Sequence, residues 1–139
     1  MGRIKFHQEG ALLVEMAFVM PIFALIFLAI IDGGLAIREH QILQNAAREA
    51  TRFASLPPGA TDNVIRQKVV DYCMEEKIPI DAAADVTIAP YDIPLGGGLY
   101  ADGKIVTVSH SRQMLILGAP LLPSSSIRLT GRSVFRNLF

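Results

Sequence analysis

The N-terminal part of the chain carries a continuous apolar run followed by a helical pattern. Positions 11–31 are 21 residues with one charge, Glu15, and a helix of about 20 apolar residues crosses a bilayer core. From 35 to 54, apolar or small residues recur every three or four positions, which predicts an amphipathic helix. Gly33-Gly34 predicts a bend between the two parts. Pro57-Pro58-Gly59 predicts the end of the helix.

The pattern changes in the second half of the chain. A short second helix is predicted to begin at Thr61 or Asp62, either of which can N-cap it, and to stop before Pro79. Alternation with period two then predicts three strands, over 85–89, 104–110 and 127–135. Asp102-Gly103 predicts a hairpin turn directly before the second strand. Three strands need a covering layer, which the apolar stripe of the long helix supplies. The expected fold is α+β, with a long N-terminal helix packed on a small antiparallel sheet.

Flanking charges predict the orientation of the apolar run. Arg3 and Lys5 precede it, whereas residues 32–36 carry no basic side chain. The positive-inside rule therefore places the N-terminus in the cytoplasm and everything after Asp32 outside, which in a bacterium means the periplasm or the cell exterior. A cleaved secretory signal ending at Gly34-Leu35-Ala36 is the competing interpretation, although its apolar region usually spans about 7–15 residues. The expected organisation is a leader over 1–10, a transmembrane helix over 11–31 and an extracytoplasmic domain over 32–139.

Composition and cysteine content narrow the function classes. The 13 basic and 13 acidic residues balance, so no nucleic-acid partner is expected. Cys73 is the only cysteine of the sequence, which excludes an intramolecular disulfide. It is either a buried small residue on a helix face or the site of an intermolecular disulfide.

The remaining motifs give no catalytic or metal-binding constellation. His7, His40 and His110 are scattered, and Ser109-His110-Ser111 lacks the logic of a catalytic triad. Gly96-Gly97-Gly98 lacks the Lys and Ser/Thr of a phosphate-binding loop and is read as a flexible connection. The apolar stretch over 114–122 is either core or a partner-binding patch. We therefore expect no enzymatic activity, metal, cofactor or small-molecule substrate.

Glu15 is the most informative single residue. A charge inside a bilayer costs a few kcal/mol at mid-depth, so it needs a partner or a function. The alternative is a tolerated carboxylate that reaches the interface. Its position favours a function, because Gly10 precedes the apolar run and Glu15 is the fifth residue counted from Ala11.

These residues resemble a known family. A basic leader ending in Gly, before an apolar segment with Glu at its fifth position, resembles the class III signal of type IV pilins and pseudopilins. The run over 9–17, followed by Pro21, is similar to the TadE-like group of tight-adherence (Flp) pilus systems, and 45–54 resembles that group's second recurring stretch. The resemblance implies a pilin-like fold and a minor pilin or pseudopilin in the bacterial inner membrane, on the pilus or cell surface after processing. Its implied partners are the membrane, a prepilin peptidase, other pilins and pilus assembly proteins.

The resemblance also implies roles for particular residues. A prepilin peptidase would cut between Gly10 and Ala11, and Glu15 would pair in the membrane with the new amine of a neighbouring subunit. Met16 stands where major Flp pilins place an aromatic residue, and this chain is longer than they are, which favours a minor component. The alternative is an uncleaved, permanently anchored periplasmic accessory protein of a secretion or pilus assembly machine.

Three charged residues form either a solvated helix face or a contact with the sheet or another subunit: Arg48, Glu49 and Arg52.

Overall fold

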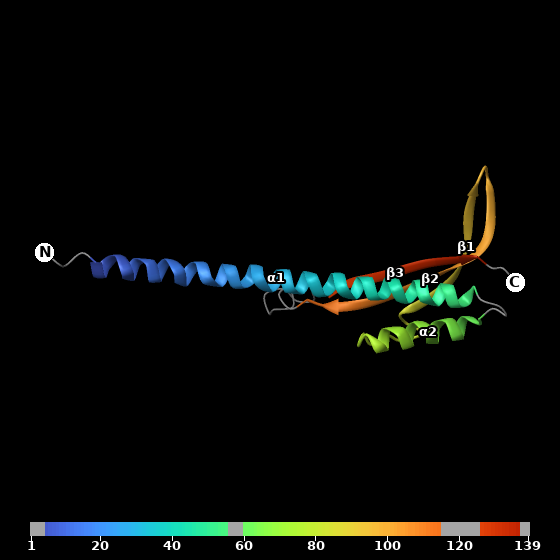
Figure 1. The fold of residues 1–139 in the computed structure, drawn as a ribbon, viewed down its shortest axis with the longest axis horizontal. Coiled ribbons are helices and arrows are strands. Elements are labelled where there is room, and N and C mark those ends of the chain that lie inside the picture. Colours follow the sequence, from blue (N-terminus) through green and yellow to red (C-terminus); the bar gives the residue numbers. More distant parts are fainter. Residues whose placement is uncertain (1–4, 56–59, 115–125, 137–139) are drawn as a thin grey trace.

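The computed structural model describes residues 5–55, 60–114 and 126–136, with side chains described from Gly10 onward. Figure 1 shows a long helix, a shorter helix beside its far end and a three-stranded antiparallel sheet in the order β1-β2-β3. The α+β prediction is confirmed. The elements are α1 Lys5–Ala54, α2 Asp62–Glu75, β1 Val86–Gly96, β2 Leu99–Gln113 and β3 Ser126–Arg136.

The first helix is longer and more regular than predicted. α1 has 50 residues, which corresponds to about 75 Å at 1.5 Å per residue. It continues through Pro21 and through Gly33-Gly34 (Figure 1), so the bend predicted at the two glycines is absent. Asp32 and Ala36, on either side of them, are buried against the folded domain, which holds this segment in line. The helix ends at Ala54, and the predicted terminator over 57–59 lies outside the described residues.

The second helix agrees with its prediction. α2 follows Thr61, which is extended (φ −68°, ψ 153°) and makes no side-chain capping hydrogen bond. Ile65, Val69 and Cys73 lie four residues apart and are fully buried, as expected for one face of a helix. After α2, the Ile78 N–H donates to the Cys73 carbonyl (2.8 Å), and the Ile78 side chain completes the core.

The core lies between the second half of α1, α2 and one face of the sheet. Leu43, Val106 and Val108 are fully buried there. Backbone contact between α1 and β3 is close, because a Cβ at Gly131 would lie 2.4 Å from the carbonyl carbon and oxygen of Leu43. The predicted covering of the sheet by the amphipathic part of α1 is therefore confirmed.

The predicted turn at Asp102-Gly103 is wrong. Both residues lie inside β2, where they pair with Asp92 and Tyr91 of β1. A Cβ at Gly103 would come within 2.7 Å of the Ile93 Cδ1 atom and of the Phe135 carbonyl oxygen, so this glycine permits a close approach. The actual turn is formed by Gly97-Gly98 between the end of β1 at Gly96 and the start of β2 at Leu99. The three glycines have φ values of 89°, 62° and 81°, a region open to glycine. The predicted connection at these glycines is confirmed.

The free edge of β1 carries two prolines. The Ser109 N–H donates to the Asp85 carbonyl (2.9 Å), and antiparallel pairs alternate between hydrogen-bonded and non-hydrogen-bonded. The backbone groups of even-numbered β1 residues therefore point away from β2, and Pro90 and Pro94 are both even-numbered members of the strand. Their missing N–H groups cost no ladder bond and hinder pairing with a foreign strand.

Candidate functional site

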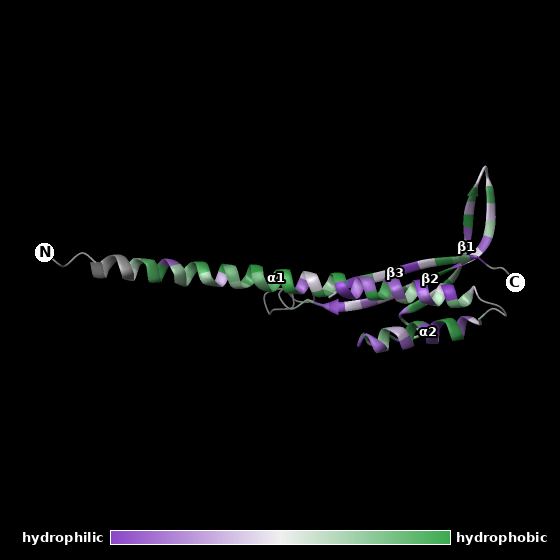
Figure 2. Cartoon of the chain, viewed as in Figure 1, coloured by the Kyte–Doolittle hydropathy of each residue, from purple (hydrophilic) through white to green (hydrophobic). Residues whose placement is uncertain are grey.

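The N-terminal half of α1 has no protein cover. Large apolar side chains between Leu12 and Ile31 are 39–74% exposed, and Figure 2 shows this half as mostly hydrophobic. Within the described residues, one helix is long and apolar enough to cross a membrane. An uncovered apolar surface of this length suits a lipid environment. The helix is thus compatible with a single-pass membrane anchor.

Gly10, Ala11 and Glu15 lie together near the start of this helix. Ala11 and Glu15 are exposed, and no atom outside the local backbone lies within 4 Å of a Cβ built at Gly10. Four residues separate Ala11 from Glu15, which is about 6 Å along the axis. The Gly10–Ala11 bond lies inside α1, so a protease must unwind the helix to reach it. Glycine eases this step, since it disfavours a helix by about 1 kcal/mol relative to alanine.

A buried ion-pair network lies at the end of the apolar run of residues 11–31. Arg112 of β2 places its Nη2 atom 3.4 Å from the Asp32 Oδ1 atom, and its Nη1 atom donates to Glu39 Oε1. The side chains of Asp32 and Arg112 are only 4% and 13% exposed. Asp32 and Glu39 are two helical turns apart on α1, so Arg112 spans one face of the helix. The network joins the sheet to the first turns of α1 beyond the apolar run.

Gln44 covers the edge of β3. Its side-chain Nε2 donates to the Arg132 carbonyl (2.6 Å), and its Oε1 accepts from the Arg132 N–H (3.0 Å). This amide takes the place that a neighbouring strand would fill. Thr51, two turns further along α1, lies with its Oγ1 atom 2.9 Å from the Ser133 Oγ atom. α1 therefore satisfies backbone groups that an exposed edge would leave open.

Sequence reasoning missed the network and the edge contact. In the sequence, Asp32 marks only the end of the apolar run, because its partner Arg112 lies 80 positions away. Gln44 is one of the polar positions between the apolar ones of residues 35–54, and its strand partner Arg132 lies 88 positions away. One signal was available for Arg112: it occupies the same strand face as the buried Val106 and Val108. A charged residue at a core-facing position requires a buried partner.

The three charged residues of the candidate interaction face point to solvent. Arg48 and Arg52 are exposed and Glu49 is half-buried. Arg52 Nη1 lies 3.8 Å from Glu49 Oε2, with side chains 79% and 42% exposed. Exposed pairs of this kind stabilise little. In the described part of the chain none of the three makes a hydrogen bond or ion pair to the sheet, and a contact with another subunit stays a prediction.

Two groups outside the anchor have shifted pKa values. Burial raises the pKa of the Cys73 thiol from 9.0 to about 11, and the side chain is fully buried. The buried interpretation of Cys73 is confirmed. At Asp81, hydrogen bonds from the N–H groups of Ala84 and Ala83 lower the pKa of an exposed carboxyl. This carboxylate stabilises the turn that leads into β1.

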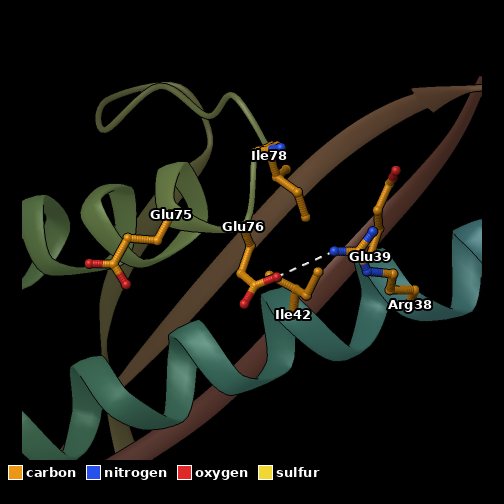
Figure 3. Close-up of a pocket in the computed structure, with 7 residues that line it drawn as sticks. Arg38, Glu39, Ile42, Glu75, Glu76 and Ile78 are labelled. Atoms are coloured by element: carbon orange, nitrogen blue, oxygen red, sulfur yellow. Dashed lines mark hydrogen bonds and ion pairs between the residues drawn. The ribbon is translucent and has the colours of Figure 1, made fainter.

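An open pocket of about 270 Å³ lies between α1 and the end of α2. Figure 3 shows Arg38 reaching toward Glu76, with 3.4 Å between Nη2 and Oε2. Glu39, Glu75 and Lys77 also line it, so opposite charges are mixed around the opening. Over the described residues, no three His, Cys, Asp or Glu side chains are placed to hold a metal ion.

The other candidate motifs lie in or beyond the strands. Ser109-His110-Ser111 lies inside β2, which continues to Gln113. His40 and His110 belong to different elements, α1 and β2. The apolar stretch over 114–122 lies outside the described residues after Met114.

The uncovered helix and the helix–sheet domain define the class as an α+β protein with a long apolar N-terminal helix that is compatible with a membrane anchor. The family model described as TadE-like protein matches residues 10–52, from the glycine before the apolar run almost to the end of α1. Over this segment the chain is similar to TadE-like proteins, and the resemblance noted in the sequence is confirmed. The match indicates a role in the tight-adherence (Flp) pilus system and association with the membrane and pilus assembly machinery. Neither a search of curated proteins nor one of solved structures found a match.

Proposed function

We propose that this chain is a non-enzymatic minor pilin or pseudopilin that acts in biogenesis of a tight-adherence (Flp) pilus. It is held in the inner membrane by α1, with the helix–sheet domain in the periplasm, and a prepilin peptidase cuts it after Gly10. The supporting observation is that the TadE-like match starts at Gly10, directly before an apolar helix face that no other part of the described chain covers. That face is open to lipid and to the anchors of other subunits.

Cleavage would create a positively charged partner for the Glu15 carboxylate. The new amine on Ala11 is cationic at neutral pH. Glu15 lies about 6 Å further along the same helix, so the two groups of one chain are offset along the axis. A parallel neighbour shifted by about that distance brings its amine beside this carboxylate. In a low-dielectric environment the pairing offsets the desolvation of both charges and sets the stagger between subunits.

The mass of the mature chain tests the processing step. The full chain is expressed with an active prepilin peptidase, and the intact mass and N-terminal peptide are measured. We expect a chain that begins at Ala11, and a Gly10→Val variant that remains uncut because a branched side chain obstructs approach to the backbone. Gly34→Val, an equal change further along α1, is the control and should be cut normally. A mature chain that begins at Met1 would favour the permanently anchored accessory protein.

Replacement of Glu15 tests the assembly step. Glu15→Ala should be cut as efficiently as the native chain, yet its recovery in sheared pili or in cross-linked complexes with other subunits should fall at least tenfold. Glu75→Ala removes an exposed carboxylate from α2, outside the apolar segment, and should assemble normally. Normal assembly of Glu15→Ala would eliminate the pairing mechanism while leaving the processing claim intact.

A further inference from the structure

The far end of the β1–β2 hairpin projects from the molecule. Figure 1 shows it leaving the long axis at the level where α1 ends. Three of its apolar side chains are strongly exposed, Leu95 at 57%, Leu99 at 68% and Tyr100 at 67%. Exposed apolar groups gathered on one projecting element mark interaction sites. With prolines on its free edge, this hairpin is suited to contact through its faces.

One face of the hairpin combines two carboxylates with an aromatic ring. Asp92 and Asp102 are direct cross-strand partners, in a non-hydrogen-bonded pair, where side chains approach most closely. Like charges placed this way destabilise a hairpin. Tyr100 lies two residues from Asp102 on the same face, opposite Pro94. We call these four residues the acidic–aromatic face.

This face has the chemistry that recognises arginine. Neither Asp92 nor Asp102 has a hydrogen-bond or ion-pair partner within the described ranges. A guanidinium group placed between them relieves their repulsion, and it stacks on an aromatic ring such as Tyr100 better than an ammonium group does. The ligand that fits is therefore an arginine side chain.

The same chain carries a row of exposed arginines. Arg128, Arg132 and Arg136 are spaced by four residues on β3, or about 13 Å. They lie on the face of the sheet opposite Gly131 and Phe135, which are buried. None of the three is paired with a carboxylate among the residues the structure describes. Among the residues that the structure describes, Arg128 donates to the Ser109 hydroxyl (3.0 Å).

The acidic–aromatic face and the Arg136 end of the arginine row lie at the same level along the long axis of the molecule. Gly103, at the root of the hairpin, pairs with Arg136 across β2 and β3. Copies anchored by α1 in one membrane stand parallel, so the hairpin of one copy reaches the level of Arg136 on the next. We propose that the acidic–aromatic face of one copy binds the arginine row of a neighbouring copy, with Arg136 as the central contact. Val134, 39% exposed, offers an apolar contact beside that arginine.

This contact joins two different surfaces, so it is heterologous and can add further copies in an open series. It concerns the outer domain and does not depend on cleavage after Gly10 or on Glu15. A failure of the processing test therefore leaves it standing, and its own failure leaves the processing claim unchanged.

The test uses the full chain reconstituted in lipid vesicles, with association followed by energy transfer between two tagged populations. Asp102→Arg and Arg136→Glu should each weaken association roughly tenfold, because each places like charges together. A one-to-one mixture of the two variants should recover association, because one copy keeps an intact hairpin and the other an intact arginine row.

Matched controls separate the contact from general charge effects. Asp71→Arg and Lys68→Glu make equal charge changes on exposed positions of α2 and should associate as the native chain does. Association through the anchors is common to all variants and cancels in the comparison. Unchanged association of both single variants would overturn the proposal. Weakened variants that fail to recover when mixed would also overturn it, since the hairpin and the arginine row would then not bind each other.

Discussion

Gly131→Ala tests the closest contact in the domain. The added Cβ would lie 2.4 Å from the Leu43 carbonyl carbon and 2.6 Å from the Gln44 nitrogen, whereas carbon atoms pack at about 3.5–4.0 Å. Gly131 lacks a positive φ, so the clash and not the backbone conformation is the cause. Both partners are backbone, so β3 and α1 must separate by about 1 Å. Overpacking of this kind costs about 3 kcal/mol, and reduced freedom of the unfolded chain returns less than about 1 kcal/mol.

The expected net loss in the free energy of unfolding is about 2 kcal/mol, or roughly thirtyfold in the opening equilibrium. Cys73 supplies the assay, because it is the only cysteine in the sequence and is fully buried. The rate at which a thiol reagent labels it in the full chain, held in detergent micelles, reports opening of the domain. We expect labelling of Gly131→Ala to be roughly thirtyfold faster than that of the native chain.

Two further glycines provide a graded control for this prediction. A Cβ at Gly34 meets nothing within 4 Å, so Gly34→Ala should label no faster than the native chain. Gly103→Ala should lie between the two, because one of its close neighbours is the movable end of the Ile93 side chain. Labelling of Gly131→Ala at the rate of Gly34→Ala would refute the close-contact reasoning.

Two other predictions concern stability. The pKa of Cys73 is raised from 9.0 to about 11 in the folded chain, so its contribution to stability is present below pH 9 and is lost as the pH rises from 9 through 11. The free energy of unfolding of the native chain, measured by urea titration, should therefore fall more steeply over this pH range than that of Cys73→Ala. Parallel plots of this free energy against pH for the two proteins would contradict the raised pKa of Cys73. Gln44→Met keeps side-chain length but removes both hydrogen bonds to Arg132. It should lower the free energy of unfolding, measured by urea titration, by about 1–2 kcal/mol. A loss below a few tenths of a kcal/mol would show that water replaces the side-chain amide.

The periodic elements were predictable because their signals are local. A period of 3.6 over residues 35–54 and a period of two in 104–110 each record which face of the element is buried. The strand lengths were underestimated, since β1 and β2 extend beyond the core as a hairpin in which most side chains are exposed. Alternation weakens where burial no longer separates the two faces, so the ends of these strands leave no signal in the sequence.

The Asp102-Gly103 error has a specific physical reason. Asp-Gly is a strong turn signal when glycine supplies a positive φ, but Gly103 supplies space for Ile93 and Phe135. The two uses of glycine look alike in a sequence. Only the arrangement of all three strands distinguishes them.

The sequence by itself determined the long apolar run, the position of Glu15 relative to Gly10, the α+β class and the resemblance that the TadE-like match confirms over residues 10–52. These features depend on residues close together along the chain. The tertiary structure decided that Arg112 joins Asp32 and Glu39, that Gln44 closes the edge of β3, and that the hairpin stands level with Arg136. Each of these depends on strand register and helix placement, which bring together residues separated by tens of positions and leave no periodic signal in the sequence.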